Sequence, residues 1–551
     1  MSDHNIARAS MWMALGTVFS RATGLLRLLM LFWAIGGVLN ADIFNNANTI
    51  PNAMYILVAG GIFNVVLVPQ LVRTMKFDTD GGQAYANRVI TLGLTVLFVA
   101  TVILIAVVPW LLHVVFAQSF FAPELEAQRS AAILLMQLCM PQVFFYGAFV
   151  LLGQVLNARG RFGPMMWAPI VNNVIACSML GLYVAVWGSS NSSDGFSTAQ
   201  TLLLGLGSTL GIAAQFVTLV PFLRATGFGY RPRFDWRGVG LSHTIKLGAW
   251  TLMFIIVNQI AFIVVNRLGT GATSQAAVSD EPAAGSAVYE LGFLVSQVPH
   301  GVITVSLTTA IMPTLAALAA DGHNDRIRLQ LGRSMRIAMV IIAPLAVLVA
   351  CLGPDGIQVL LSVGAISGQV GPIGLTLQCF APAMVLFPLQ YVTLRGFYAR
   401  EDTRTPFLIQ IVISSANIIL AVVLTSMVDP ARVAAMLALS FGVAYGLGLL
   451  VSTSLLSRQI GRFTDAVMLR FAGRLILACV ITAAVMLAST ALLRVRGLAA
   501  VGIGSGSDVG ALVTLVIAGV LGAGAYLASM RVLRIEEFGY AISTILRRRG
   551  A

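Results

Sequence analysis

Long apolar stretches separated by short polar ones run along the whole sequence. Each stretch is roughly 20 residues or longer, which is the length a helix needs to cross the hydrocarbon core of a bilayer. The pattern therefore predicts an all-α polytopic membrane protein with 14 transmembrane helices. The predicted spans are 11–38, 50–72, 89–116, 131–156, 164–187, 199–223, 241–266, 286–318, 330–352, 371–394, 405–427, 432–456, 470–493 and 510–530.

The basic residues lie almost entirely on one side of this predicted array. Of the 34 Lys and Arg residues, 27 fall in the N-terminal tail, in the loops after even-numbered spans or near the start of the span that follows such a loop, and in the C-terminal tail. The loops after odd-numbered spans, together with the first residue of the span that follows, hold only Arg129, Arg267, Arg432, Arg494 and Arg496. Because basic loops stay in the cytoplasm, both termini are predicted to be cytoplasmic. The net charge of +13 thus belongs to loops beside spans, which argues against a nucleic-acid partner.

Composition narrows the possible chemistry. The chain has 551 residues, of which 58% are hydrophobic and only 10% are charged, so it has the composition of a membrane protein. Its five cysteines and five histidines are scattered, without the spacing of a metal site, and no phosphate-binding glycine loop occurs. We expect no metal, no cofactor and no ATPase activity.

Two similar stretches indicate an internal repeat. Residues 157–164 (Asn-Ala-Arg-Gly-Arg-Phe-Gly-Pro) and 398–406 (Tyr-Ala-Arg-Glu-Asp-Thr-Arg-Thr-Pro) each precede a span that contains Asn. A weaker pair begins at Gly61 and Gly301. Their common offset predicts two parallel six-helix repeats. The predicted parts are an N-terminal lobe (1–223), a C-terminal lobe (241–456), helices 13–14 (470–530) and an amphipathic basic tail (531–551) on the anionic cytoplasmic leaflet.

Charged residues inside spans are costly and are candidates for function. Arg21 and Arg27 lie in the first span, six residues apart, so they occupy helix faces about 120° apart, as on a broad cavity wall. The alternative is that their side chains reach toward the cytoplasmic interface. Asp42 follows this span on the external side, and Glu290 enters span 8 from outside.

Other polar residues gather in the same spans. Asn45, Asn46, Asn48 and Asn52 follow Asp42, and the usual role of such a cluster is turn and cap chemistry. The remaining polar residues each suit an interhelical hydrogen bond, and they are Asn64, Asn258, Gln259, Gln297 and His300. Together, spans 1, 2, 7 and 8 predict a cationic cavity between two lobes. Such a cavity suits an anionic headgroup, since Arg can bind phosphate through two parallel hydrogen bonds.

A combination of motifs carries a resemblance to a known family. The chain resembles the MviN/MurJ lipid II flippases of the multidrug/oligosaccharidyl-lipid/polysaccharide exporter superfamily from about residue 6 to about 475. The motifs are Phe19-Ser20-Arg21 with Gly24 and Arg27, Asp42, Pro51-Asn52, residues 61–69, Asn157 with Arg161-Phe162, Ala168-Pro169, Pro299 with Gly301, Met312-Pro313 and residues 397–406.

The resemblance implies a fold of 14 helices and a function in bacterial cell-wall synthesis. Family members move lipid II, an undecaprenyl-pyrophosphate-linked disaccharide pentapeptide, from the inner to the outer leaflet of the cytoplasmic membrane. Arg21 and Arg27 match basic cavity residues, Asp42 matches a family acid, and Asn52 lies in the Pro-Asn motif. In the family, helices 13–14 form a groove proposed to take the lipid tail. The implied partners are lipid II, membrane lipids and cell-wall synthases.

Three departures from the family pattern stand out. Tyr55 replaces an Arg after the Pro-Asn motif, and Leu294 and Gln297 replace Arg and Glu in span 8. The sodium-binding acids of some relatives have no counterpart in spans 7, 11 and 12.

The sequence therefore predicts a transporter and not an enzyme. It would move lipid II by alternating access, with Arg21 and Arg27 holding the pyrophosphate and with Asp42 and Glu290 competing for those arginines. The alternatives are an exporter of another undecaprenyl-pyrophosphate-linked glycan and a transport-inactive scaffold of cell-wall synthesis. A drug exporter would need cavity carboxylates, and a membrane enzyme would need a cluster of acids or a His–acid pair.

Overall fold

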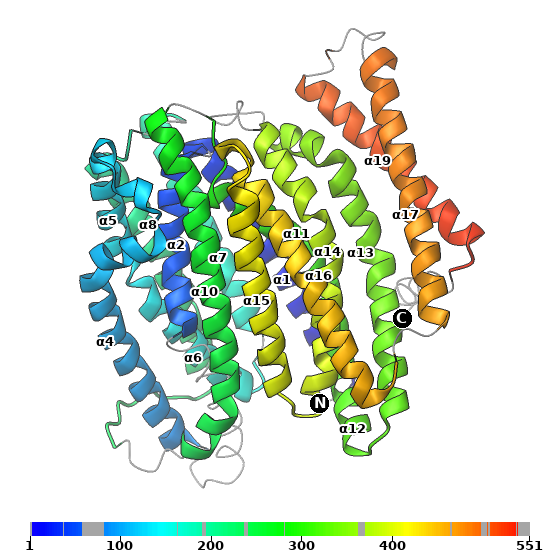
Figure 1. Cartoon of the computed structure of the whole chain (residues 1–551). Coiled ribbons are helices and arrows are strands. Elements are labelled where there is room, and N and C mark those ends of the chain that lie inside the picture. Colours follow the sequence, from blue (N-terminus) through cyan, green and yellow to red (C-terminus); the bar gives the residue numbers. More distant parts are fainter. Residues whose placement is uncertain are drawn as a thin grey trace. The chain divides into compact units, whose positions relative to one another are not determined.

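The computed structural model describes residues 3–36, 38–57, 82–161, 163–189, 194–235, 241–279, 282–361, 370–462, 466–497, 504, 507–535 and 537. Their secondary structure is helical throughout, without a strand in these ranges (Figure 1). Twelve helical stretches among them are long and apolar enough to cross a membrane. This confirms the predicted all-α polytopic class. The count of 14 and the side of the termini stay predictions, since most of the predicted span 50–72 lies outside the described residues.

Contacts divide the chain into two units. Unit 1 comprises Met1–Glu281 and Gly285–Ala287, and unit 2 comprises Pro282–Ala284 and Val288–Ala551. Helix α10 (Leu241–Ser279), which covers the predicted span 241–266, packs in unit 1 against α2 and α4. The two repeats were inferred from similar stretches of sequence, whereas the two units are defined by contacts, so the predicted boundaries of the repeats stay a prediction.

Unit 1 is built from apolar helices that pack along one another. Its helices before α10 are α1 (Asp3–Ile35), α2 (Leu39–Tyr55), α4 (Gln83–Val115), α5 (Glu126–Cys139), α6 (Gln142–Ala158), α7 (Gly163–Trp187), α8 (Thr198–Val217) and α9 (Leu219–Arg224). Helix α1 packs along α7, and α7 packs along α8. A core of buried side chains from α2, α4, α5 and α6 lies at the centre of the unit.

The boundary between the first two helices differs from the sequence prediction. Helix α1 ends at Ile35 because Gly36 adopts a φ of 84°, a left-handed conformation that favours glycine. Helix α2 then begins at Leu39, so Asp42 and the asparagines lie inside a helix, and the predicted turn at the Asn cluster is wrong. The amides of Asn46 and Asn48 donate to the carbonyls of Asp42 and Phe44 one turn earlier, and the helix thereby accommodates these polar side chains.

Unit 2 packs its helices around α14. They are α11 (Ser286–Pro299, whose first two residues belong to unit 1), the π turn η5 (His300–Thr304), α12 (Val305–Ala320), α13 (Asn324–Leu361), α14 (Val370–Tyr398), α15 (Arg404–Thr425), α16 (Val433–Ile460), α17 (Ala466–Leu492), η7 (Leu493–Gly497) and α19 (Asp508–Val532). Helix α14 packs between α13 and α16, while α17 and α19 pack on each other and on α13.

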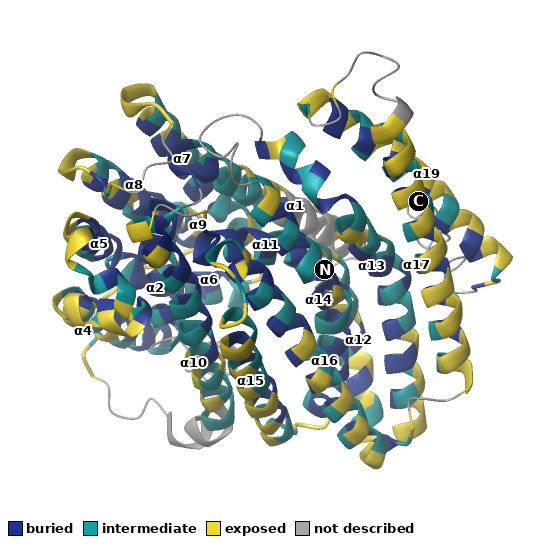
Figure 2. Cartoon of the chain, turned by 45° about the horizontal axis from the view of Figure 1, so that its top comes forward, coloured by how far each residue is buried: buried dark blue, intermediate teal, exposed yellow. Residues whose placement is uncertain are grey.

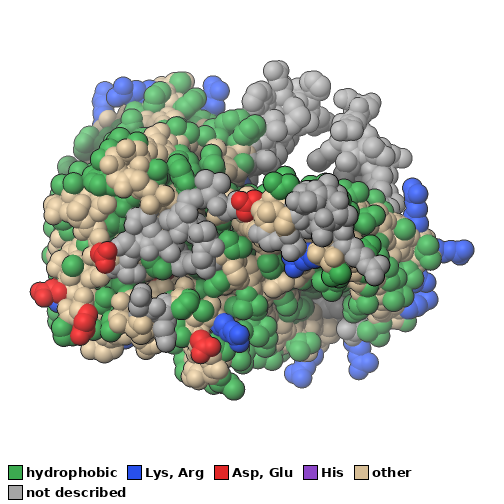
Figure 3. Space-filling model, turned by 90° about the horizontal axis from the view of Figure 1, so that it is seen from above, with side chains coloured by type: hydrophobic (Ala, Val, Ile, Leu, Met, Phe, Trp, Pro, Cys, Tyr) green, Lys and Arg blue, Asp and Glu red, His purple; other side chains and the backbone are tan. Residues whose placement is uncertain are grey.

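Large apolar side chains cover much of the helix surfaces. Exposed residues follow α17 and α19 along their length (Figure 2). Figure 3 shows an end face of the molecule, seen from above, on which most of the visible Lys and Arg side chains lie near the outline. Exposed apolar area on this scale is expected where helices contact lipid.

Candidate functional site

The two predicted arginines lie on different faces of α1. Arg21 is exposed, whereas Arg27 is half-buried, and the charge of Arg27 acts on Cys139, Tyr146 and Cys177 of neighbouring helices. Neither arginine forms an ion pair with a described residue. Arg27 is thus a half-buried cation of unit 1 without a protein counter-charge in the described part of the chain, and such a cation can accept an anionic ligand.

Helix α7 holds this part of α1 in place. The amide of Asn173 donates to the Ser20 carbonyl (3.1 Å) and to the Thr23 hydroxyl oxygen (2.9 Å). Both acceptors lie between Phe19 and Gly24, within the motif that contains Arg21. Asn173, one of the asparagines that the repeat singled out, therefore has a positioning role in the structure.

Tyr55 occupies the place where relatives carry an arginine. Its ring is buried and stacks on Tyr146, with 6.1 Å between the ring centroids. The charge of Arg27 also acts on Tyr146, so the aromatic pair and this cation belong to the same region of unit 1. Asn52, one turn before Tyr55, is half-buried on α2.

Asp42 is fully buried and caps the start of another helix (0% exposed). Its Oδ1 accepts from the backbone N–H of Ala287 (2.6 Å), and its Oδ2 accepts from the N–H of Ser286 (3.1 Å) and from the Thr273 hydroxyl (2.7 Å). Ser286 and Ala287 are the first residues of α11, where backbone N–H groups lack partners within the helix. A carboxylate is favoured there because the N-terminus of a helix carries partial positive charge.

Two glycines let these segments approach. A Cβ atom on Gly285 would lie 2.2 Å from Asp42 Oδ2 and 2.9 Å from the Gly269 carbonyl oxygen, and a Cβ on Gly269 would lie 2.8 Å from the Ser286 nitrogen. The absence of a side chain at both positions therefore allows the backbone of these segments to lie close to Asp42. The structure does not bring Asp42 to Arg21 or Arg27, since both of its oxygens are engaged with Thr273, Ser286 and Ala287.

Glu290 lies one turn further along α11 and is half-buried. It forms no ion pair with a described residue. The neighbouring Tyr289 and Phe293 belong to an aromatic cluster with Phe380 and Phe441 of α14 and α16. Glu290 is therefore an acid beside an aromatic core in unit 2.

Sequence reasoning missed Arg395. The predicted span ended at 394, so Arg395 was counted as a loop residue, but α14 continues to Tyr398. The guanidinium lies over the ring of Tyr391, 4.1 Å from its centroid, and its buried Nε has no hydrogen-bond partner among the residues that the structure describes. The ring of Tyr391 in turn meets His300 edge-on, at 4.8 Å. Arg395 is thus a further arginine on an apolar helix, in the last turn of α14.

Several other polar residues have structural roles. Gln259 donates to the Ala53 carbonyl (3.0 Å), and Asn266 donates to the Val115 carbonyl (3.2 Å), as expected for interhelical hydrogen bonds. Asn64 lies outside the described residues. Across the described ranges, no group of three or more His, Cys, Asp or Glu side chains could hold a metal ion.

Comparisons with known proteins agree with this architecture. The family described as "Lipid II flippase MurJ" matches residues 33–504. The chain is 27% identical over 421 residues to the "Probable lipid II flippase MurJ" of Haemophilus influenzae, covering 73% of this chain and 77% of that protein. It is 25% identical over 419 residues to the protein of the same description from Vibrio cholerae, covering 73% and 74%.

Solved structures share the fold. "Lipid II flippase MurJ, inward closed conformation" superposes with a TM-score of 0.70 at 17% identity, covering 95% of this chain and 98% of that chain. A multidrug resistance MATE family transporter of the MOP superfamily, in its inward-facing conformation, gives 0.62 at 13% identity, covering 81% and 98%. At these identities the likeness concerns the fold alone. The family match spans most of the chain, and the protein belongs to the lipid II flippase MurJ family.

Proposed function

We propose that this protein is a flippase that carries lipid II from the inner to the outer leaflet of the bacterial cytoplasmic membrane by alternating access. The family match over residues 33–504 carries the proposal. The all-helical structure with 12 candidate spans supports it, as does a half-buried arginine of unit 1 that has no counter-charge among the described residues. The role is transport, and no covalent chemistry is required.

Within unit 1, Arg27 is the proposed ligand of the pyrophosphate. An arginine offers five N–H donors in a planar fork, which suits bidentate binding of phosphate. The stacked rings of Tyr55 and Tyr146 lie in the same unit and are proposed to line the site. Arg21 and Asn52 are proposed as further polar contacts of the substrate. Because the family match begins at residue 33, the roles of both arginines rest on the structure and on the resemblance of the first helix.

The acids have different proposed roles. Asp42 holds the start of α11, so it becomes available to an arginine only when this cap opens. Glu290 is proposed to contact the substrate or a cation from unit 2. Lipids of the membrane and cell-wall synthases are proposed partners.

A second candidate function is the export of another undecaprenyl-pyrophosphate-linked glycan. The observation that favours it is the replacement of two cationic positions of the family by Tyr55 and Leu294. Tyr55 is buried against Tyr146, so no cation can occupy that place without repacking. A headgroup with less negative charge would fit this arrangement.

Complementation tests the proposal. In cells whose essential lipid II flippase can be switched off, this chain should restore growth, and Arg27→Ala should abolish the rescue while its amount in the membrane stays unchanged. Arg326→Ala, which removes an exposed arginine in the first turn of α13, is the matched control and should rescue fully. Rescue by Arg27→Ala would contradict the assigned site. Failure of the wild-type chain despite insertion would favour the second candidate function.

A further inference from the structure

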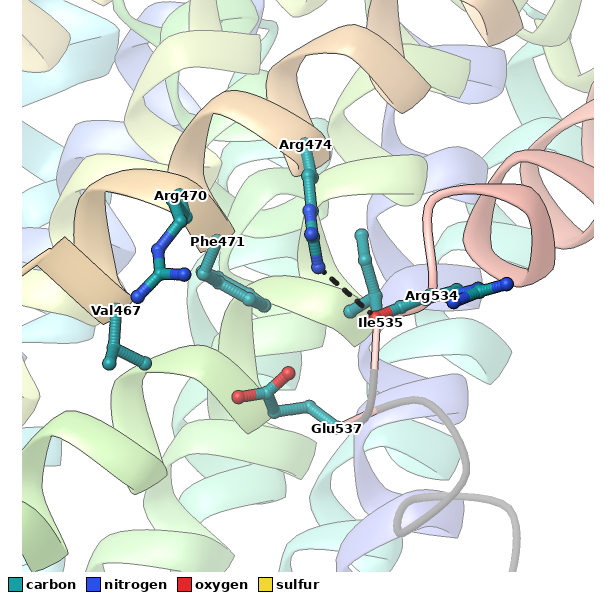
Figure 4. A pocket seen from close by; sticks show the side chains of 7 residues that line it. All are labelled: Val467, Arg470, Phe471, Arg474, Arg534, Ile535 and Glu537. Carbon is teal, nitrogen blue, oxygen red and sulfur yellow. Dashed lines mark hydrogen bonds between the residues drawn. The ribbon is translucent and has the colours of Figure 1, made fainter.

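A cavity of about 310 Å³ lies beside the first turns of α17, and its lining shares no residue with the candidate site. Its lining comes from α17 and from the segment after α19 (Figure 4), and consists of Val467, Arg470, Phe471, Arg474, Arg534, Ile535 and Glu537. All of these residues belong to unit 2. Since a water molecule takes up ~30 Å³ of the liquid, the space would hold on the order of ten waters, which is ample for a phosphate group.

Two arginines face this space from α17. Arg470 and Arg474 are four residues apart and therefore lie on the same face of the helix. Arg470 donates through Nε to the Ala466 carbonyl (2.9 Å), and Arg474 donates through Nη1 to the Arg534 carbonyl (3.3 Å). Each guanidinium thus uses one nitrogen for the protein and keeps other N–H donors for a ligand. The side chain of Arg534 points away from the other lining groups (Figure 4).

The carboxylate in the lining does not neutralise these arginines. Glu537 forms an ion pair with Nε of Arg336 from α13, so its charge is balanced from outside the cavity. Within the described part of the chain, neither Arg470 nor Arg474 forms an ion pair. Among the described residues, the two arginines of the lining are therefore not paired with an acid, and the cavity suits an anion.

The surroundings of the cavity are apolar on one side. Val467, Phe471 and Ile535 line it, and the lipid-facing side of α17 continues from it with Leu469, Ile476 and Val480, whose side chains are 59–63% exposed. The loop before α17 and the segment after α19 belong to the basic side of the chain, which the charge distribution assigns to the cytoplasm. A ligand with an anionic head and apolar chains matches both walls, whereas a soluble anion matches only one.

We propose that this cavity binds the phosphate of an anionic phospholipid from the cytoplasmic leaflet. Arg470 and Arg474 donate to the phosphate oxygens, and Val467, Phe471 and Ile535 contact the glycerol and the first methylenes of the acyl chains. The bound lipid would tie the start of α17 to the segment after α19. This inference does not depend on the transported substrate, so it stands or falls separately from the flippase assignment.

Native mass spectrometry of the full-length protein in detergent tests the site. Phosphatidylglycerol is titrated against phosphatidylcholine with the same acyl chains, for the wild type and for the Arg470→Gln/Arg474→Gln variant. The Arg458→Gln/Arg462→Gln variant is the matched control, because it removes two exposed arginines at the end of α16 with the same loss of charge. We expect the first variant to bind phosphatidylglycerol on the order of tenfold more weakly, given the electrostatic contribution of each basic residue near an anionic lipid. The control should bind like the wild type.

Two further experiments test whether the planar guanidinium groups are needed and whether the ligand is a lipid or free phosphate. The Arg470→Lys/Arg474→Lys variant keeps the charge but loses the planar fork, so it should bind with intermediate affinity. Millimolar inorganic phosphate should leave phosphatidylglycerol binding unchanged. Equal loss of binding in the Arg458→Gln/Arg462→Gln control, equal binding of the two lipids by the wild type, or displacement of the lipid by inorganic phosphate would each overturn the proposal. Retention times in size-exclusion chromatography without added lipid show that the variants are folded.

Discussion

At the scale of single residues, Gly285 is among the most tightly enclosed positions of the chain. A methyl group there would meet Asp42 Oδ2 at 2.2 Å and the Thr273 methyl carbon at 2.5 Å. Gly285→Ala should therefore destabilise the protein by about 1–3 kcal/mol, the usual cost of overpacking, and lower its thermal midpoint in detergent. Gly356→Ala is the control, because a Cβ on Gly356 meets nothing within 4 Å. It should be neutral or stabilising by up to about 1 kcal/mol. Equal midpoints for both variants would contradict the close contact at Asp42.

Asp235, which lies outside the membrane-spanning helices, attaches the segment that precedes it to α4, and this attachment depends on pH. Its carboxylate accepts from Arg88 Nε (2.7 Å), and this hydrogen bond lowers the pKa of Asp235 below its usual range. A lowered pKa means that the stabilisation is present above the unfolded-state pKa of ~3.9 and is lost as the pH falls through the folded value. The segment before Asp235 is also tied to α4 through the amides of Arg231 and Arg233.

We expect these two amides to stay protected from hydrogen exchange at pH 5–8 and to lose protection below about pH 4. Mass spectrometry of exchange, corrected for the intrinsic rate at each pH, measures this. In Asp235→Asn, both amides should show at every pH the weak protection that the wild type shows only at low pH. A profile for the variant that matches the wild type would show that the ion pair does not hold the segment.

The sequence revealed which residues are unusual, but not what they contact. Asp42, Glu290 and Arg27 were singled out because a charge among apolar residues is costly. The partners of Asp42 at Ser286 and Ala287 lie 244 and 245 positions away, and one sequence contains no signal for that pairing. Arg395 was missed for a simpler reason, since the predicted span ended at 394, four residues before the end of α14 at Tyr398.

At the scale of elements, most helices could be predicted because each apolar stretch has the length of a span. The errors lie where the backbone departs from a regular helix without a change in hydrophobicity. Gly36 ends α1 before the apolar stretch ends, and the π turn His300–Thr304 interrupts a stretch that reads as one helix. The cavity beside α17 also escaped prediction, because its lining combines the start of one helix with residues that follow another.

An ion pair joins the far ends of two helices in unit 2. Arg494 of η7 contacts Asp355 of α13, with 2.6 Å between Nη2 and Oδ1, and the Asp355 side chain is only 5% exposed. Arg494→Gln should lower stability by roughly 1–3 kcal/mol because it leaves a nearly buried carboxylate without its partner. In Asp355→Asn/Arg494→Gln the loss should be smaller than the sum of the two single variants. Additive changes in the thermal midpoint would show that the pair is not coupled.

At the scale of the whole molecule, the charge distribution predicts an orientation that can be measured. In a variant without the five native cysteines, Glu124→Cys and Asp325→Cys place single thiols at exposed positions in loops of opposite predicted side. A membrane-impermeant maleimide added to intact cells should label the Glu124→Cys protein and not the Asp325→Cys protein. Lysed cells should give equal labelling of both. The reverse pattern in intact cells would invert the predicted topology.

The buried cap at Asp42 also has a consequence for synthesis. Its partner N–H groups are encoded 244 residues later, and a ribosome adds ~5–20 residues per second. Asp42 therefore enters the membrane roughly 12–50 s before Ser286 exists. During this time its carboxylate must be protonated, hydrated at the interface or shielded by the insertion machinery. Early helices of this protein thus remain incomplete until the chain has passed its midpoint, and truncation before residue 286 should leave an N-terminal half that is prone to degradation.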